Sequence, residues 1–383
     1  MSSGNRTDLR DAQAVPAVLG MRQSGLVDIV SGSFGAGHDS AALEIATRFR
    51  AQGYVTRTWD IVDLFPAHLG ELLRWAYLRQ IRSLPGSWEM LLERLEPGSP
   101  LNRAVGRGLA LTSDSLLDIA ASRPEVIVST HPFASQALGR LRAAGRLECP
   151  VVTYLTDMSV HPLWVHPSVD LHLALHEIPA AQARRWNGTT TVIEPLVAFG
   201  DAHRPPDRRS VHDLRRSIGL PTGETLALVT GGSLGIGELA RSATDIAETG
   251  LALPVVLCGE NTSLYRRLRS TPHVVRLGWR DDLPEVLRAV DCVVQNSGGF
   301  TSLQTIAAGT PALSYRCLPG HGRSNARALH QAGLIPWAQT KSDLRHELAG
   351  ALAERRTTNP RVEPRMRPDV VDAVFPERLR ASA

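Results

Sequence analysis

The chain repeats one local pattern in its two halves: a short apolar run, a glycine-rich loop and an amphipathic stretch. In the first half, residues 26–30 have the pattern of a buried strand, the loop Ser31–His38 follows, and residues 40–52 have a helical pattern. In the second half, residues 226–230 precede Gly231–Gly237 and another helical stretch. Because strands that alternate with helices form parallel sheets through right-handed crossovers, the pattern predicts two doubly wound α/β domains.

The remaining apolar runs complete this prediction. We expect further strands at 54–61, 126–129, 151–155, 171–175, 255–258, 274–277, 292–295 and 312–314, and a closing helix at 369–379. A chain of 383 residues is long enough for two domains. The predicted boundaries are a flexible leader at 1–25, an N-terminal domain at 26–197, a proline-bearing linker at 198–207, a C-terminal domain at 208–358 and a tail at 359–383.

Composition excludes several classes of protein. The net charge is +4, with 42 basic residues diluted by 38 acidic ones, which is too weak a basic balance for a nucleic-acid partner. The four cysteines stand far apart, so we expect reduced thiols and neither a zinc site nor disulfides. No apolar run approaches the roughly 20 residues that span a bilayer, and no signal peptide is evident, so a cytoplasmic location is expected.

His38 is the first candidate for chemistry. It ends a loop with glycines at 32, 35 and 37, placed between a strand and a helix. This spacing matches neither the dinucleotide-binding nor the Walker fingerprint. In doubly wound sheets such loops border the ligand crevice, where an imidazole can remove a proton near neutral pH. The alternative is a histidine that only caps the helix.

Asp157 follows a predicted buried strand and precedes a segment that carries His161, Trp164 and His166. A carboxylate at the carboxyl end of a strand could orient His38 or bind a substrate hydroxyl. It could instead cap a helix, and the aromatic side chains could be lid packing. No metal-ligand spacing such as His-Glu-x-x-His accompanies these residues, so no metal site is expected.

Two loops of the second half suit a diphosphate. Gly231, Gly232, Ser233 and Gly235 follow one strand, and the segment from Asn296 to Thr301 follows a later one. Each precedes a helix whose first amide groups favour an anion. Two such helix ends can hold both phosphates of a nucleotide without a cation.

The stretch Leu64–Leu95 departs from the alternation of strands and helices. It mixes leucines, tryptophans and a tyrosine with arginines at positions 74, 79 and 82. This mixture is typical of a helix at an anionic membrane surface, and also of core packing with a charged rim.

Together these motifs resemble the GT-B glycosyltransferases that use a UDP-sugar. The resemblance is greatest to the branch of monogalactosyldiacylglycerol synthase and the bacterial diacylglycerol glucosyltransferases, and more distant to the peptidoglycan N-acetylglucosaminyltransferase. It rests on five motifs in family order: Gly35-Ala-Gly-His38, Thr156-Asp157 with His161-Pro-x-Trp164-x-His166, Gly231-Gly-Ser-x-Gly235, Gly298-Gly-x-Thr301 and Gly320-x-x-x-x-Asn325. They cover roughly residues 26 to 340.

The resemblance implies a GT-B fold of two Rossmann-like domains and a role for each matching residue. His38 would deprotonate the acceptor hydroxyl with Asp157 as its partner. The donor site would comprise Gly231, Gly232, Ser233 and Gly235 on one loop, Gly298, Gly299 and Thr301 at the diphosphate, Asn325 at the sugar, and Trp279 and Arg280 where backbone groups hold uracil. The family glutamate at the ribose is Gln304 here, and the family glutamine after Gly320 is His321.

The implied function is metal-independent transfer of a hexose, with inversion, from a UDP-sugar to a hydroxyl of a lipid such as diacylglycerol. No cofactor is expected, and the enzyme would lie peripherally on the inner face of the cell membrane. Gln304 and His321 leave open a glycosyltransferase of specialised metabolism that acts on a soluble aglycone or a phosphoglycolipid. A UDP-sugar epimerase on the same two-domain scaffold and a protein that senses a nucleotide sugar stay open as well.

Overall fold

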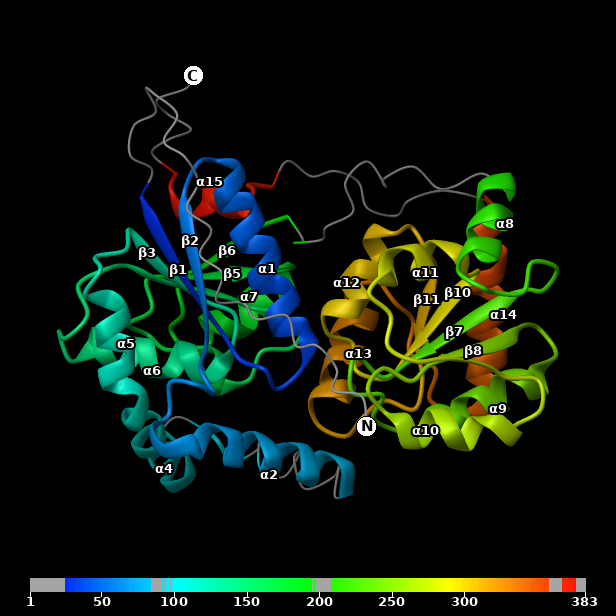
Figure 1. The fold of residues 1–383 in the computed structure, drawn as a ribbon, viewed down its shortest axis with the longest axis horizontal. Coiled ribbons are helices and arrows are strands. Elements are labelled where there is room, and N and C mark those ends of the chain that lie inside the picture. The colour runs from blue at the N-terminus through cyan, green and yellow to red at the C-terminus, as the bar shows by residue number, and fades with distance from the viewer. Residues whose placement is uncertain are drawn as a thin grey trace, which may run out of the picture.

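The computed structural model describes residues 25–83, 91, 94–96, 98–194, 196, 208–357 and 367–376. These residues form two α/β domains that lie side by side, each built around one parallel sheet (Figure 1). The predicted linker 198–207 lies outside the described residues, and so do the leader up to residue 24 and most of the tail. The predicted domain boundaries therefore stay predictions.

The N-terminal sheet has six parallel strands in the order β2-β1-β3-β4-β5-β6. Because the central strands are covered on both faces, they are mostly apolar, as in Leu26–Ser31 and Val126–Ser129. The strands are β1 (Leu26–Ser31), β2 (Val55–Asp60), β3 (Val126–Ser129), β4 (Val151–Tyr154), β5 (Leu171–Ala174) and β6 (Thr190–Val192).

Helices cover both faces of this sheet. One face packs against α1 and α15, and the other against α5 and α6. The helices of this part are α1 (Ala36–Ala51), η1 (Pro66–His68), α2 (Leu69–Ser83), α4 (Pro100–Leu109), η2 (Ala110–Thr112), α5 (Ser113–Ala120), α6 (Pro132–Ala143), η3 (Pro162–Trp164), α7 (Glu177–Arg184) and α15 (Val370–Val374).

The C-terminal sheet has five parallel strands in the order β11-β10-β7-β8-β9. The strands are β7 (Leu226–Thr230), β8 (Leu253–Leu257), β9 (Val275–Leu277), β10 (Cys292–Gln295) and β11 (Ala312–Ser314). The helices are α8 (Arg208–Ser217), α9 (Leu239–Thr249), α10 (Thr262–Arg267), η4 (Leu268–Ser270), α11 (Leu283–Ala289), α12 (Phe300–Ala307), α13 (His321–Gln331) and α14 (Lys341–Thr357).

The predicted strands are confirmed to within two residues, and two doubly wound sheets are confirmed. Three details differ. The short edge strand β6 is not among the predicted ones, because its three residues are polar or β-branched and none is fully buried. Helix α1 begins at Ala36 rather than at residue 40, so His38 lies in its first turn. The closing helix α15 spans only Val370–Val374 and returns to the N-terminal sheet, where Asp369 pairs with Arg48 at 2.5 Å.

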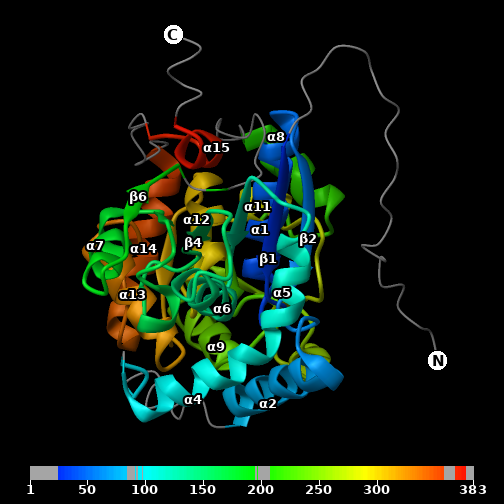
Figure 2. The ribbon, with the colours of Figure 1, turned by 90° about the vertical axis from the view of Figure 1, so that its left-hand side faces the viewer.

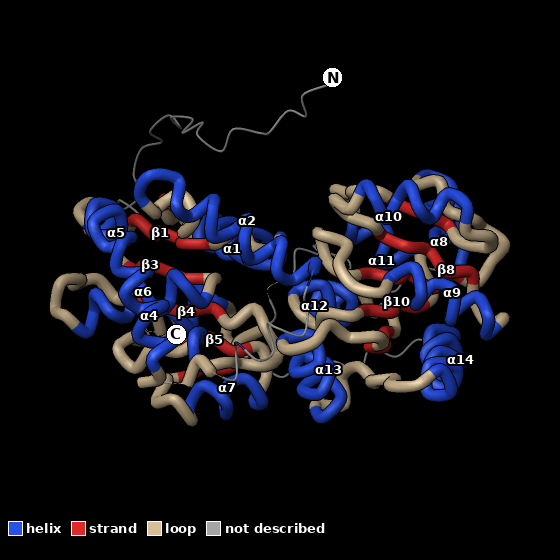
Figure 3. Tube along the Cα trace, turned by 90° about the horizontal axis from the view of Figure 1, so that it is seen from below, coloured by secondary structure: helices blue, strands red, loops and turns tan. Residues whose placement is uncertain are grey.

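The two domains share an apolar interface. Phe300 and Leu303 of α12 and Leu329 of α13 belong to the same buried cluster as Ile29 of β1 and Tyr154 of β4. Seen from below, α12 and α13 lie on the side of the C-terminal sheet that faces the N-terminal domain (Figure 3). The loops that follow β1 and β4 consequently meet the C-terminal domain at Ser233 and Asn325.

The pair Asp28–Arg57 stabilises the N-terminal sheet. The Asp28 carboxylate is fully buried on β1 and accepts two hydrogen bonds of 2.7 Å from Arg57 on β2, with a third of 2.9 Å from Trp59. Arg57→Met would leave a buried carboxylate with only the indole as partner. We expect this variant to lower the free energy of unfolding by about 3 kcal/mol, measured by denaturant unfolding.

The double variant Asp28→Asn/Arg57→Met is the control. A buried amide needs no counter-charge, so the double variant should recover part of the stability that Arg57→Met loses. A single variant as stable as the parent chain would contradict this role of the pair.

Candidate active site

His38 lies where the strand order of the N-terminal sheet reverses. The strands β1 and β3 run in parallel next to each other, and their connections leave on opposite faces of the sheet. The chain enters α1 after β1 and turns at Thr130 after β3, which places the two residues together in the crevice typical of such folds. The Nδ1 atom of His38 lies 2.8 Å from the carbonyl oxygen of Thr130 and 3.3 Å from the hydroxyl of Thr156.

This geometry fixes the tautomer of His38. A carbonyl oxygen can only accept a hydrogen bond, so Nδ1 carries the proton and donates it to Thr130. In the neutral ring Nε2 then holds the free lone pair, which is the state required of a general base. The Thr130 hydroxyl in turn donates to the backbone carbonyl of His38 at 3.1 Å, so the contact holds the ring and its backbone together.

Aromatic side chains surround the His38 ring. The ring of His131 meets it edge to face with 4.7 Å between centroids, and the Trp164 ring lies 5.8 Å away. Burial lowers the pKa of His131 well below its ordinary value, and the neighbouring His38 and His161 lower it further. His131 accordingly stays neutral beside His38 and adds no competing charge.

Asp157 has partners that the sequence does not predict. Its carboxylate accepts a hydrogen bond from the Asn325 amide at 3.0 Å and one from the Trp164 indole at 3.3 Å. The Nδ1 atom of His38 is held by Thr130 instead, and no hydrogen bond joins Asp157 to His38 within the described residues. The role of Asp157 as the partner of His38 therefore stays a prediction. Asp157 caps no helix either; the residue before η3 is His161.

Asn325 connects the two domains. It is fully buried, its amide nitrogen donates to Asp157 and to the Ser297 carbonyl, and its oxygen accepts from the amide of Ser159 at 2.7 Å. Both amide hydrogens are thus used within the protein. In this conformation the side chain holds the loop after β4 against the start of α13, and the expected contact of Asn325 with the sugar stays a prediction.

The first loop of the C-terminal domain has the conformation that its glycines predict. Gly232 and Gly235 have φ of 73° and 54°, and a Cβ on Gly235 would lie 2.1 Å from the Cys258 carbonyl, so only glycine fits there. The Ser233 hydroxyl accepts a hydrogen bond of 3.1 Å from the amide of Ala36, the first residue of α1. This contact brings the donor-side loop to the helix that carries His38.

The second loop closes the other side of the crevice. Gly298 has a φ of 65° and packs on Asn325, while Gly299 precedes α12 at a point where a Cβ would lie 3.5 Å from the Asp157 carboxylate. Thr301 and Gln304 follow on α12, whose N-terminus therefore lies next to Asp157. The amide of the buried Asn296 donates to the Ile236 carbonyl at 2.8 Å and joins the two glycine loops.

The remaining predicted donor residues occupy separate places. Trp279 follows β9 with half of its surface exposed, and Arg280 pairs with Asp282. His321 is the first residue of α13; burial lowers its pKa, against an opposing effect of Asp157. Burial likewise lowers the pKa of His161 to about 4. His321 and His161 are therefore uncharged neighbours of the Asp157 carboxylate.

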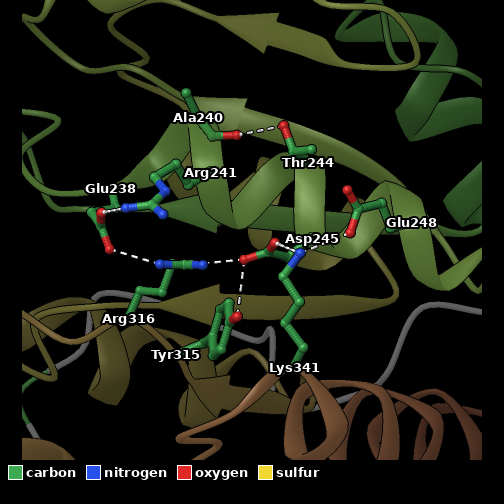
Figure 4. Close-up of polar contacts among 9 residues, drawn as sticks. All are labelled: Glu238, Ala240, Arg241, Thr244, Asp245, Glu248, Tyr315, Arg316 and Lys341. Atoms are coloured by element: carbon green, nitrogen blue, oxygen red, sulfur yellow. Dashed lines mark hydrogen bonds and ion pairs between the residues drawn. The ribbon is translucent and has the colours of Figure 1, made fainter.

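A charged cluster that the sequence does not predict supports the donor loops (Figure 4). Arg316 has a left-handed φ of 45° at the start of the segment that leads to His321. Its guanidinium pairs with Glu238 at 2.8 Å and with Asp245 at 2.7 Å. Because Glu238 directly follows the Gly231–Gly237 loop, the pairs tie that loop to the segment before α13. Lys341, the one lysine of the sequence, also pairs with Asp245 at 2.8 Å.

Thr130 and His131 are two further site residues that sequence reasoning misses. They directly follow the predicted strand 126–129, so their place at a strand's carboxyl end is the available signal. His166, by contrast, is predicted near the site but lies away from His38 and packs on Gly139 of α6. Its expected place on the rim of the site is not supported.

Two features are absent from the described residues. Within them, no group of three or more His, Cys, Asp or Glu side chains is placed to hold a metal ion. The helices of that same part of the chain include none with the length and apolarity needed to cross a bilayer. The cysteines at 149, 258, 292 and 317 are all free thiols.

Comparisons with known proteins agree with this arrangement. Residues 38–196 match the family model of monogalactosyldiacylglycerol (MGDG) synthase. An uncharacterised glycosyltransferase of Bacillus subtilis, YkoN, is 22% identical over 79% of this chain and 81% of its own length. The processive diacylglycerol beta-glucosyltransferase of the same organism is 23% identical over 61% of this chain and 62% of its own length.

Solved structures show the same fold. The Arabidopsis thaliana enzyme UGT89C1 in complex with UDP superposes with a TM-score of 0.54 at 15% identity, covering 87% of this chain and 92% of its own. MurG of Acinetobacter baumannii gives 0.52 at 14% identity, covering 88% and 96%. The chain is a GT-B glycosyltransferase. The expected GT-B fold and enzyme class are thus confirmed, and the loops that meet between the two sheets are the candidate active site of this transferase.

The carboxylates around Arg316 make the stability of this glycosyltransferase depend on pH. Burial alone would raise the pKa of Asp245, but hydrogen bonds from Lys341, Arg316 and Tyr315 outweigh burial and lower it. A carboxyl whose pKa is lower in the folded than in the unfolded chain stabilises the fold above the unfolded pKa of about 4, and this stabilisation is lost as the pH falls through the folded value.

We therefore expect Asp245→Asn to reduce the thermal midpoint at pH 7 and to flatten its decline between about pH 5 and pH 3. The measurement is thermal unfolding as a function of pH for both proteins. Parallel curves, displaced by the same amount at every pH, would contradict the assigned role of the Asp245 charge.

Proposed function

We propose that this glycosyltransferase moves a hexose from a UDP-sugar to a hydroxyl of a diacylglycerol-like lipid, with inversion at the anomeric carbon. The observation that carries the proposal is the hydrogen bond from His38 Nδ1 to Thr130, which leaves the lone pair of Nε2 free on a helix whose first residue contacts the donor-side loop. The match of residues 38–196 to the MGDG synthase model and the diacylglycerol glucosyltransferases among the relatives support the lipid acceptor.

In the proposed mechanism His38 removes the proton of the acceptor hydroxyl while that oxygen forms the new bond to the anomeric carbon. The bond between the sugar and UDP breaks on the opposite face, which gives inversion. Asp157 lies beside the two neutral histidines His161 and His321, where it can accept a hydrogen bond from a substrate hydroxyl. The uracil would lie on the loop that carries Trp279 and Arg280.

Negative charge develops on the departing diphosphate. The glycine loop Gly231–Gly235 and the N-terminus of α12 at Gly299 supply backbone dipoles that can stabilise this charge without a metal ion. Gln304 follows on α12 and can hydrogen-bond the ribose as a neutral group. Closure of the domains over the donor would exclude water and limit hydrolysis of the sugar nucleotide.

The acceptor side would lie against a membrane. Helix α2 packs its inner face into the protein through Tyr77 and Ile81, whereas Leu72, Leu73 and Trp75 on its outer side are 58%, 40% and 58% exposed. The helix lies at the end of the N-terminal domain where the strands end (Figure 1). Such exposed apolar side chains are typical of a membrane-surface helix. The rest of the predicted segment, 84–90 and 92–93, lies outside the described residues.

The base is tested by His38→Ala. We expect turnover with a UDP-sugar and dispersed diacylglycerol to fall by a factor of about 10² to 10⁴, because the acceptor proton loses its base. UDP affinity, measured by calorimetry, should change little, since the diphosphate is expected to bind to the C-terminal domain. Unchanged turnover would remove His38 from the mechanism; loss of UDP binding as well would indicate a structural role.

Metal independence is tested by chelation. Activity should persist in EDTA, since backbone dipoles rather than a cation would stabilise the leaving diphosphate. An activity that EDTA abolishes and Mg²⁺ restores would contradict this part of the proposal.

The membrane contact is tested with Leu72→Ser. Because Leu72 is exposed on the outer side of α2, this variant should bind lipid vesicles more weakly than the parent chain in a cosedimentation assay. The matched control is Leu43→Ser on α1, where leucine is 63% exposed. Equal effects of the two substitutions would exclude α2 as the contact.

A further inference from the structure

A basic cavity lies on the N-terminal domain outside the active-site crevice. It opens between α4 and α6, has a volume of about 620 Å³ and is lined by Arg103, Arg107, Arg140 and His166 over a floor of glycine and alanine. No acidic residue lines it within the described part of the chain. The cavity is therefore complementary in charge to an anion.

The three arginines are unpaired in the described part of the chain: none has a carboxylate partner or a hydrogen bond from its side chain there. The Nε atom of Arg140 is shielded from solvent without a partner. By contrast, Arg142, two residues further on, pairs with Asp170 at 2.6 Å. Arg103 and Arg107 also stand one helical turn apart on α4, where like charges repel each other. A bound anion would relieve this repulsion.

Two glycines make room for the side chains of Arg140 and His166. A Cβ on Gly106 would lie 2.5 Å from the guanidinium carbon of Arg140, and a Cβ on Gly139 would lie 2.4 Å from Cγ of His166. Both side chains therefore rest on backbone that only glycine leaves open. This contact fixes Arg140 against α4 instead of letting it extend into solvent.

His166 contributes a hydrogen-bond donor without a charge. Its Nδ1 atom accepts a hydrogen bond of 3.2 Å from the amide of Ser168, so the proton of the neutral ring is on Nε2. Burial, helped by the nearby Arg140, lowers the pKa of His166 to about 4. The ring thus stays neutral at physiological pH and can donate to an oxyanion.

We propose that this cavity binds the phosphate of an anionic phospholipid in the membrane on which the enzyme acts. The inference rests on the proposed membrane contact and deepens it. Leu111 follows Ala110 of the cavity floor and is 49% exposed, next to the site that the headgroup would occupy. The helices α4 and α2 share one buried cluster through Val105 and Tyr77, and they lie at the same end of the domain (Figure 2). One membrane surface can thus contact α2 and the cavity beside α4 at the same time.

The test compares vesicles of phosphatidylcholine alone with vesicles that also contain phosphatidylglycerol. The variant Arg103→Gln/Arg107→Gln/Arg140→Gln should lose about tenfold or more of its affinity for the anionic vesicles. The control Arg50→Gln/Arg185→Gln/Arg327→Gln removes the same charge from exposed positions elsewhere. It should lose much less. Equal losses in the two variants would overturn the site in favour of unspecific attraction.

Gly106→Ala provides a second variant that keeps every charge. The methyl group would displace the Arg140 guanidinium, so binding to anionic vesicles should weaken, while the thermal midpoint should not fall because alanine favours a helix over glycine. Unchanged vesicle binding would contradict the proposed geometry.

Two further measurements distinguish failure of the lipid assignment from failure of the proposed function. Stabilisation of the parent chain by glycerol phosphate at concentrations that do not affect the triple variant would assign the cavity to a soluble phosphate and overturn the lipid. Transfer to detergent-dispersed diacylglycerol should be the same in the parent chain and the triple variant. If neither protein transferred a sugar but the vesicle results held, the proposed function would fail and the anion site would stand.

Discussion

The structure of the candidate site depends on the hydrogen bond between His38 Nδ1 and the Thr130 carbonyl. The bond joins the helix after β1 to the turn after β3, which are neighbours only because the strand order reverses there. It sets which nitrogen of the imidazole is free, and it keeps the ring at the edge of the crevice. A carbonyl partner does this without placing a negative charge beside the base, unlike the carboxylate partner that the sequence suggests.

The rest of the crevice follows from the same construction repeated in the second sheet. Its order also reverses, between β7 and β10, and a glycine loop follows each of these two strands. The strand order reverses at one point in each sheet, and these two points face each other. As a result, the N-terminus of α1 contacts the Ser233 loop and the N-terminus of α12 lies next to Asp157. The buried Asn325 and the shared apolar cluster hold them there. Helix ends and backbone dipoles are thus concentrated where a diphosphate would need them.

The sequence predicts those parts that depend on local patterns. Apolar runs of four to six residues mark buried parallel strands, and glycines that follow a strand mark the loops, so His38, Ser233 and Gly298 can be identified from neighbouring residues alone. Contacts between distant residues are not predictable in this way. The pairing of Asp157 with Asn325 spans 168 positions and that of Arg316 with Glu238 spans 78. Which polar side chains form hydrogen bonds with each other depends on how the domains pack. The strand β6 likewise depends on tertiary structure, because it forms by pairing with β5.

The tautomer of His38 is the property whose measurement tests this site most directly. In ¹⁵N-labelled protein, with the His38→Gln variant used for assignment, we expect that near neutral pH the uncharged ring carries its proton on Nδ1 and has an unprotonated Nε2. Binding of UDP should leave this state in place, because the diphosphate is expected to bind to the C-terminal domain. A neutral ring with its proton on Nε2 would contradict the role of His38 as the base, because the nitrogen that is not held by Thr130 would then have no lone pair.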